Sequence, residues 1–417
     1  MKKEKNEKGI TLIALVITII VLLILAGITI SALSGDNGIL TRAKEAKDKT
    51  EQAQKEEEKT LSSMENILGI YNFKNINVAD TNPAETVPEN STVVEDDASK
   101  GIVIKDINGN EWVWVEVPKT TVFKGLVINT AGVLAKDDYT AIKNKLIEYA
   151  GTYRKGATKQ NENWTDEWYD GCGLTSDEYT AAYQKMLKSV YTYGGFWIGR
   201  YEAGIEGSIE DISKTRTTHT DITIGASPKA ISQKDAIPYN WIYCSEAQAL
   251  AKEMTPDSNY TNSLMFGIQW DLVCKFLEVK GELAIKDINS NSTSWGNYNN
   301  AKIENITSGK YVIYKNNALG EWKKISGIYT KPNTSPDYNT ILSTGISDYT
   351  RKMNIYDFAG NEWEWTLEKT SDSNNYCASR GGLYYDLGSN YPASYRNALG
   401  TAHSGIGVSF RATFYIN

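Results

Sequence analysis

Histidine and cysteine are scarce in this chain of 417 residues, which contains two histidines and four cysteines. His219 and His403 lie far apart in the sequence, and two imidazoles cannot build a metal site that needs three. The cysteines form no Cys-x-x-Cys pair, which argues against a zinc or redox motif of that type. Their even number is compatible with disulfides in an exported domain, and buried free thiols explain it equally well.

A basic surface is also absent. The formal net charge is −7 and the pI is about 5.2, with lysines scattered among acidic residues. Binding to a phosphate backbone therefore has no electrostatic support, and we expect no nucleic-acid partner. The chain does have 41% hydrophobic residues, enough for a packed core, so disorder does not describe the whole of it.

Charge is missing altogether from residues 10–34, which are dominated by Ile, Leu and Val. A helix of this length spans roughly 37 Å, enough to cross a bilayer. Residues 1–9 carry four Lys and two Glu, which favours a cytoplasmic leader and places the rest of the chain outside. We predict a single-pass transmembrane helix over 10–34. A secretory signal peptide is the alternative, although its apolar region would be shorter.

The stretch from Lys8 to Val16 resembles the leader of type IV pilins and pseudopilins of bacteria. The resemblance implies cleavage after Gly9, with Ile10 as the first mature residue, and a location in the bacterial cell membrane. The fifth mature position is Glu in that family and Ala14 here. Both a pilin-like assembly and a plain membrane anchor therefore remain open.

Two segments precede the globular part. A charged, proline-free stretch with Glu45/Lys49 and Glu51/Lys55 at helical spacing predicts a helical stalk over 35–71. Residues 72–100 are polar and acidic and contain two prolines, a composition typical of a flexible or extended linker. The globular domain is expected over 101–417.

Within that domain, short aromatic or apolar runs alternate with Gly, Asn and Asp. Residues 112–115 and 195–203 are typical of strands, whereas 245–254 and 268–279 have apolar residues at helical spacing. These patterns predict an α+β fold. Residues 126–190 carry mixed helical signals and are expected to form an insertion that decorates the core.

Six motifs occur in a fixed order: Phe196–Glu202, Pro238–Cys244, Ser263–Leu277, Asn354–Thr366, Arg380–Gly382 and Ser409–Arg411. Together they resemble the formylglycine-generating-enzyme (sulfatase-modifying factor) family, over roughly residues 101–417. The resemblance implies a C-type-lectin-like fold with much irregular structure.

The same resemblance bears on catalysis. Oxidases of this family carry two cysteines shortly after the Gly-Gly, where this chain has Asp386 and Tyr391. Neither side chain can supply a thiolate, and relatives that form sulfoxides need a three-histidine iron site. We therefore expect no catalysis of the family's kind. The alternative is a copper-dependent oxidase with a relocated thiol, for which Cys377 is the nearest candidate.

A calcium site is a further implication of the resemblance. In the family, the loop that matches residues 357–364 holds Ca²⁺ through two side chains and backbone carbonyls. Here Asp357 and Glu364 would supply carboxylates, and Gly360 and Glu362 would supply carbonyls, all hard oxygen ligands. The competing interpretation is that this loop only turns and packs the chain.

The most informative absence lies near the C-terminus, where residues 381–409 contain no Lys, Glu or Cys. Tyrosines alternate there with Gly, Ser, Asn and Ala, a mixture favoured in binding loops because Tyr gives rigid contact area at low entropic cost. The segment resembles the variable region of lectin-fold proteins that retroelements diversify. The predicted ligand-contacting residues are Leu383, Tyr385, Asp386, Leu387, Tyr395, Ala398, Leu399, Gly400, Ala402, His403, Gly405, Ile406 and Val408.

The leading hypothesis is a membrane-anchored, non-catalytic protein of the cell surface that binds an external protein, peptide or carbohydrate through this segment. The copper-dependent oxidase is one alternative, and a minor pilin or pseudopilin subunit of a filament is another. An ordinary loop whose tyrosines pack inward is the remaining explanation of the C-terminal pattern.

Overall fold

The computed structural model describes residues 12–34, 42–56, 73, 76–155, 164–255, 257–333, 339–370 and 376–417. The predicted leader 1–9 and the predicted cleavage site between Gly9 and Ile10 lie outside this range. The chain divides into two units, Met1–Ile70 and Tyr71–Asn417.

The described residues of the first unit form two helices. Helix α1 spans Leu12–Ser34, within the predicted membrane segment, and a second helix spans residues 42–56, within the predicted stalk. The side chains described in α1 are those of residues 15–26, all apolar except Thr18, and all are exposed. Among the described residues, no helix is both long and apolar enough to cross a membrane. The membrane anchor stays a prediction.

A six-stranded antiparallel sheet forms the centre of the second unit, in the order β1-β2-β3-β4-β18-β7. Its strands are β1 (Thr92–Glu95), β2 (Val103–Lys105), β3 (Glu111–Glu116), β4 (Gly195–Gly199), β7 (Tyr260–Leu264) and β18 (Ala412–Ile416). Aromatic side chains link strands of this sheet: the Trp114 ring of β3 and the Trp197 ring of the neighbouring β4 have centroids 5.2 Å apart. The two predicted strands match β3 and β4.

Helix α6 (Ser176–Tyr193) packs on this sheet. It begins at a capping box, in which Thr175 Oγ1 accepts from the Glu178 N–H and the Glu178 carboxylate accepts from the Thr175 N–H. It ends at Gly194, which is left-handed. The Tyr183 ring meets Phe266 at 4.9 Å in the core. The expectation that residues 126–190 merely decorate the core is therefore wrong, because the apolar face of α6 is part of that core.

The remaining helices surround the sheet or connect its strands. They are α3 (Lys119–Val122), α4 (Lys136–Ala150), α5 (Thr152–Lys155), α7 (Cys244–Glu253), α8 (Gly267–Val279) and α9 (Ile285–Asn289), with 3₁₀ turns at Pro83–Thr86 and Asp348–Thr350. The predicted helices 245–254 and 268–279 are confirmed as α7 and α8 to within one residue at each end.

The predicted linker is wrong over most of its length. Strand β1 forms one edge of the central sheet, and Ile76 is buried in the core. Thr86 Oγ1 accepts a 2.7 Å hydrogen bond from the Trp197 indole N–H. These contacts outweigh the polar composition of the segment, so the folded unit begins near Tyr71 rather than at residue 101.

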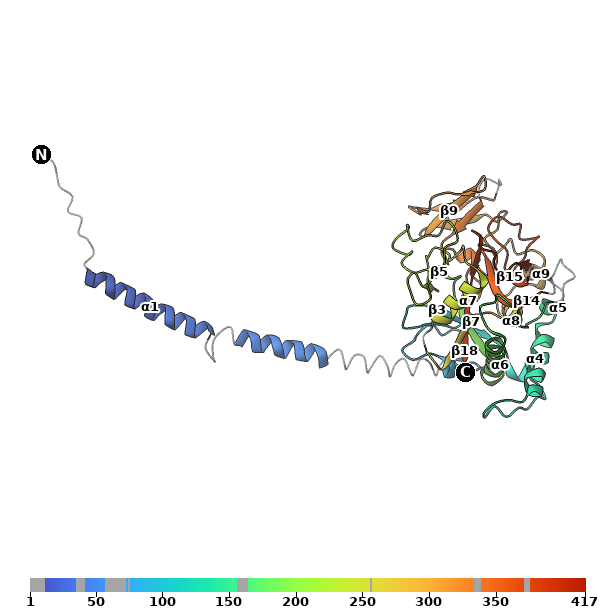
Figure 1. The fold of residues 1–417 in the computed structure, drawn as a ribbon, viewed down its shortest axis with the longest axis horizontal. Coiled ribbons are helices and arrows are strands. Elements are labelled where there is room, and N and C mark those ends of the chain that lie inside the picture. The colour runs from blue at the N-terminus through green and yellow to red at the C-terminus, as the bar shows by residue number, and fades with distance from the viewer. Residues whose placement is uncertain are drawn as a thin grey trace. The chain divides into compact units, whose positions relative to one another are not determined.

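A second sheet carries the C-terminal segment. It has the order β16-β15-β14-β17, with β17 parallel to β14, and its strands are β14 (Trp363–Lys369), β15 (Cys377–Arg380), β16 (Arg396–Leu399) and β17 (Val408–Phe410). Figure 1 shows β14 beside α8. The smaller strands are β5 (Gly204–Ile205), β6 (Ala230–Ile231), β8 (Ile303–Ile306), β9 (Lys310–Lys315), β10 (Ala318–Leu319), β11 (Lys323–Lys324), β12 (Tyr329–Lys331) and β13 (Asn339–Leu342). The architecture is thus mixed α+β, as predicted, and its sheets are open.

Candidate functional site: the C-terminal segment

Two arginines hold the base of the C-terminal segment, defined here as residues 383–408. Arg380 ends β15 and Arg396 begins β16, directly opposite each other in the register. Arg380 donates to Glu368 at 2.8 Å and to Asp271 at 2.9 Å. Arg396 donates to the same two carboxylates at 2.9 and 2.6 Å. The segment therefore leaves and re-enters the sheet at two fully buried ion pairs.

Arg154 of α5 completes this group, which we call the arginine cluster: Arg154, Arg380, Arg396, Asp166, Asp271 and Glu368. Arg154 contacts Glu368 at 2.7 Å and Asp166 at 2.8 Å. Burial alone would raise the pKa of Glu368, but the three guanidiniums outweigh it and lower this pKa to about 2. Charges of both signs are balanced, which is the condition under which buried ions are tolerated.

The backbone conformation requires glycine at position 382, directly after Arg380 and Gly381. Gly382 has φ of +80°, and a Cβ at this position would lie 2.5 Å from the Tyr391 carbonyl oxygen. A side chain would be strained and would clash with the returning chain. The Arg-Gly-Gly motif thus combines a buried ionic anchor with a turn that brings residues 382 and 391 together.

The first exposed part of the segment is the turn after Gly382. Tyr385 is 44% exposed and Leu387 is 41% exposed, and the Tyr385 ring stacks on Tyr314 of β9 with centroids 5.9 Å apart. Asp386 lies between them. Its burial raises the pKa of its carboxyl group to about 7.

The second exposed part runs from β16 to β17. Ala398, Leu399, Gly400, Gly405 and Ile406 are half-buried, and Ala402 and His403 are exposed. The His403 ring lies 6.4 Å from the Trp365 ring. The loop is fastened from behind, because the Trp241 N–H donates to the Gly405 carbonyl at 3.0 Å and Asn240 Nδ2 donates to the Ile406 carbonyl at 3.0 Å.

Three of the predicted contact residues are buried. Leu383 is 3% exposed, Tyr395 is 6% exposed and Val408 is 4% exposed. Tyr395 packs against Trp363, and Val408 pairs with the same tryptophan in the parallel ladder of β14 and β17. Their burial contradicts their prediction as contact residues. Strand pairing turns Val408 inward, and Tyr395 is held by packing against Trp363.

The predicted calcium ligands have other partners. Both carboxylate oxygens of Asp357 accept hydrogen bonds, at 2.7 Å from the Gly345 N–H and at 2.7 Å from Thr350 Oγ1. Both oxygens of Glu364 pair with Arg411, at 2.6 and 3.1 Å. A guanidinium cation already neutralises the site, and the two acids do not form a shared set of free oxygens. These residues, with Gly360 and Glu362, therefore do not fit the predicted calcium site.

Buried acids surround this loop in a group that we call the carboxylate cluster: Glu202, Asp357, Glu362 and Glu364, with Arg411. The sequence placed the last three acids in one loop but did not show that Glu202 joins them. Glu202 accepts from Asn361 Nδ2 at 2.6 Å and from the Glu362 N–H at 3.1 Å. Burial, together with the neighbouring acids, raises the pKa of Glu202 well above its ordinary value. The Glu-Trp-Glu-Trp motif contains two of these acids, Glu362 and Glu364, but no local sequence pattern indicated that Glu202 would lie beside them.

Glu362 is the least satisfied of these acids. Its Oε1 accepts from Asn240 Nδ2 at 3.0 Å, whereas its Oε2 has no hydrogen-bond partner among the described residues. Burial raises the pKa of Glu362 well above the ordinary value. Within the same described part, Asn240 Oδ1 and the Tyr384 hydroxyl also lack partners. The Glu362 and Asn240 side chains lie against the C-terminal segment, because Asn240 Nδ2 also donates to the Ile406 carbonyl.

A separate group of possible metal ligands was also missed. His219, Asp221 and Glu246 place ligand atoms within 4.8 Å of one another, and no other such trio occurs among the described residues. His219 Nε2 lies 3.0 Å from Glu246 Oε2, and that same oxygen accepts from the Tyr243 N–H at the start of α7. The Glu246 carboxylate therefore has a structural role that needs no ion.

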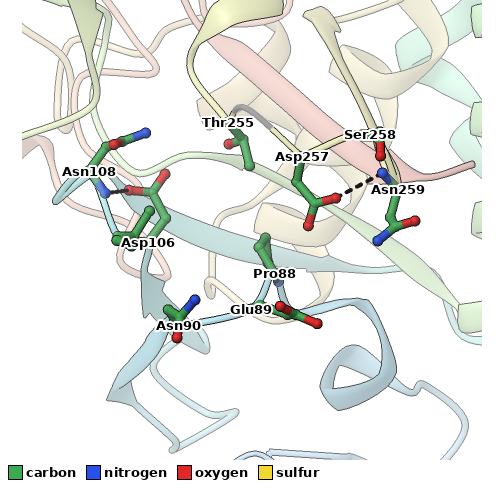
Figure 2. A pocket seen from close by; sticks show the side chains of 10 residues that line it. Pro88, Glu89, Asn90, Asp106, Asn108, Thr255, Asp257, Ser258 and Asn259 are labelled. Atoms are coloured by element: carbon green, nitrogen blue, oxygen red, sulfur yellow. Dashed lines mark hydrogen bonds between the residues drawn. The ribbon is translucent and has the colours of Figure 1, made fainter.

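Away from the segment, a cavity of about 410 Å³ is lined by polar residues of three loops. Figure 2 shows Asp106 and Asp257 on its two sides, each accepting a hydrogen bond from a backbone N–H two residues later. Asp106 also accepts from the Trp112 indole. These two acids shape turns, and Asp106 holds a core tryptophan, so both have structural roles that need no ligand.

Comparison with known proteins adds little. No protein-family model matches the chain, and no curated protein is similar to it at a significant level. Among solved structures, it is similar to Treponema denticola variable protein 1, with 11% identity, a TM-score of 0.27, and coverage of 53% of this chain and 84% of that one. At this score the similarity fixes neither the fold family nor the function.

Proposed function

We propose that this chain is a non-catalytic binding protein whose C-terminal segment presents a ligand-contacting surface on a C-type-lectin-like scaffold. The observation that carries the proposal is the separation of roles within residues 380–411. Arg380, Arg396 and Arg411 are fully buried in ion pairs, whereas Tyr385, Leu387 and His403 between them face solvent. A rigid frame with exposed aromatic and small residues is the arrangement that binding loops use.

The contact surface has two parts, the turn at Tyr385–Leu387 and the loop at residues 398–406. Tyr385 is amphipathic and already stacked on Tyr314, so little rotamer freedom is left to lose when a ligand binds. Substitutions at such exposed positions usually change stability little. The same scaffold can therefore carry different side chains there, which is what retroelement-directed diversification would require.

Exchange of the exposed residues tests the binding surface. Wild type and a Tyr385→Ala/His403→Ala variant would be screened against the same glycan array and displayed-peptide library. An Ile107→Ala/Ile328→Ala variant is the matched control, since both residues are exposed and lie outside the segment. We expect the first variant to lose its ligand and the control to keep it. Equal binding by both variants would refute the proposed surface.

The diversification hypothesis has a genomic test. A reverse-transcriptase gene and a near-copy of the codons for about 380–417 should lie near this gene, differing almost only where the copy has adenine. The codons of Arg380, Gly381 and Arg411 should match. Absence of both the gene and the copy would leave a binding protein of fixed specificity.

We further propose that the protein is anchored in a bacterial cell membrane with the folded unit outside. The described side chains of α1 are apolar except for Thr18, and a helix that is apolar on nearly all sides requires lipid or other protein around it. Protease added to intact cells should remove the folded unit. Mass spectrometry of the N-terminus will distinguish cleavage before Ile10, as in pilins, from an uncleaved anchor that keeps Met1.

The absence of catalysis is also part of the proposal. Cys377, the candidate for a relocated catalytic thiol, is fully buried, and burial is the main cause that raises the pKa of its thiol well above the ordinary value. A thiol of this kind is a poor nucleophile and a poor copper ligand. Copper-dependent oxygen consumption by the purified protein would overturn this conclusion.

A further inference from the structure

Two cysteines that are 133 positions apart in the sequence meet in the core. Cys244 is the first residue of α7 and Cys377 is the first residue of β15. Their Sγ atoms lie 3.0 Å apart, within about 1 Å of the roughly 2.05 Å length of a disulfide bond. Both side chains are fully buried. The pair is therefore positioned for a covalent bond that a small adjustment of side chains would complete.

The surroundings of this pair separate it from the other two cysteines. The Tyr169 hydroxyl lies 3.0 Å from Cys377 Sγ and 3.5 Å from Cys244 Sγ. Cys172 Sγ instead points to the Leu174 carbonyl oxygen at 3.6 Å. Cys274 lies on α8, where the nearby charges are those of the arginine cluster. The geometry thus singles out one pair among the four cysteines.

We propose that Cys244 and Cys377 form a disulfide when the chain folds in the presence of a disulfide oxidant. In this reaction two S–H bonds break and one S–S bond forms. The two protons and two electrons pass to a second disulfide, either oxidised glutathione or a disulfide of a protein oxidant, which is reduced to two thiols. The proposal is independent of which ligand the C-terminal segment binds.

The timing of this reaction follows from burial. Thiol–disulfide exchange requires access and a thiolate, and in the folded core both are lacking, since desolvation raises the pKa of Cys377. The bond must form while the core is still open. Reduced protein that has already folded should therefore resist both alkylation and oxidation.

The bond would join α7 to the sheet that carries the C-terminal segment. In the register of that sheet, Cys377 lies opposite Leu399 of β16, one of the half-buried positions of the candidate binding surface. A cross-link that closes a long loop restricts the unfolded chain and so stabilises the folded one. It would fasten the strand from which the segment departs without occupying any exposed position.

Thiol counting tests the proposal directly. The full-length chain would be unfolded in detergent with a reductant, refolded with oxidised and reduced glutathione, and titrated for free thiols after denaturation. We expect two free thiols instead of four, and a tryptic fragment that links residues 235–252 to residues 370–380. Each cysteine lies on a different tryptic peptide, so the pairing is unambiguous. Four free thiols, or a bond that involves Cys172 or Cys274, would overturn the proposal.

Variants separate this cross-link from a general effect of reductant. The Tm of refolded, oxidised wild type should fall when a reductant is present during unfolding. Cys274→Ala, the matched control with another buried cysteine removed, should keep this sensitivity, whereas Cys377→Ala should lose it. If Cys377→Ala does not fold, the wild-type thiol count still decides. A Tm of wild type that does not respond to reductant would contradict the proposed bond.

Discussion

The arginine cluster and the carboxylate cluster are equally buried, but their charges are balanced differently. The first sets three guanidiniums against three carboxylates, and the pKa of its Glu368 is lowered to about 2. The second has four carboxylates and only Arg411, and the pKa values of Glu202 and Glu362 are raised well above the ordinary range. Burial by itself therefore does not determine whether an acid anchors the fold. The number of cations within hydrogen-bonding distance does.

The largest effect is expected when the arginine cluster is unbalanced. Glu368→Gln removes a carboxylate that pairs with Arg154, Arg380 and Arg396. We expect a loss of about 3–5 kcal/mol in the free energy of unfolding, because buried guanidiniums are left uncompensated. Chemical denaturation measures this loss. Glu148→Gln, in an exposed pair with Lys145, is the control and should cost under about 1 kcal/mol.

Acid should reproduce part of this effect in the wild type. The pKa of Glu368 is lower in the folded chain than its ordinary value of 4.5, so its contribution is complete above that value and is lost as pH falls toward about 2. The Glu368→Gln variant should lack this component of the pH dependence. Parallel stability curves of the two proteins between pH 5 and pH 2 would contradict the assignment.

In the carboxylate cluster, replacing an acid is expected to stabilise the folded chain instead of destabilising it. The pKa of Glu362 is raised in the folded chain, so its ionised form opposes folding at high pH, and this penalty disappears as pH falls toward the ordinary value. Glu362→Gln should therefore raise the free energy of unfolding at pH 8, because the amide carries no charge to bury. At pH 4 the variant and wild type should be alike. Destabilisation at pH 8 would show that the charged form is needed.

Asp386 gives a smaller version of the same effect within the candidate binding surface. Burial raises its pKa from an ordinary value of 3.8 to about 7, so the penalty on folding is complete above pH 7 and disappears only as pH falls toward 3.8. Asp386→Asn should raise the Tm slightly at pH 8 and leave it unchanged near pH 3.5. A thermal shift series across this range measures both. A shift of equal size at both pH values would mean that a feature other than charge is responsible.

The smallest effect is expected from calcium. Because Asp357 and Glu364 already have full sets of partners, the Tm in EGTA should equal the Tm in excess Ca²⁺. Asp357→Ala should lower the Tm under both conditions, since the Gly345 N–H and Thr350 hydroxyl lose their acceptor. A Tm that rises with Ca²⁺ in wild type but not in Asp357→Ala would indicate that Ca²⁺ binds in this loop.

Local patterns in the sequence were sufficient for elements whose residues bury one continuous face. Helix α8 has apolar residues at helical spacing and was predicted to within one residue. Residues 76–95 were not predicted as part of the folded unit, because their composition is polar. Their few buried contacts, such as that between Thr86 and Trp197, arise only in the assembled sheet.

In the candidate site, too, local patterns predicted some features, and contacts between distant residues determine the others. The Arg-Gly-Gly turn and the exposed Tyr385 could be placed from motif and composition. The partner of Glu368 on α5 is 214 positions away, and no local signal connects the two. Nor could one sequence show that Tyr395 packs against Trp363 while Tyr385 is exposed, since contacts between distant residues determine this difference.

The place of β18 in the central sheet has a consequence for biosynthesis. This strand, Ala412–Ile416, follows the C-terminal segment in the chain and lies between β4 and β7, so the sheet cannot close until the segment before it has been synthesised. A premature stop anywhere in residues 383–408 would remove β17 and β18 together and leave the edges of β4 and β7 unpaired. Such truncated products would be substrates for proteolysis instead of carriers of a partial surface.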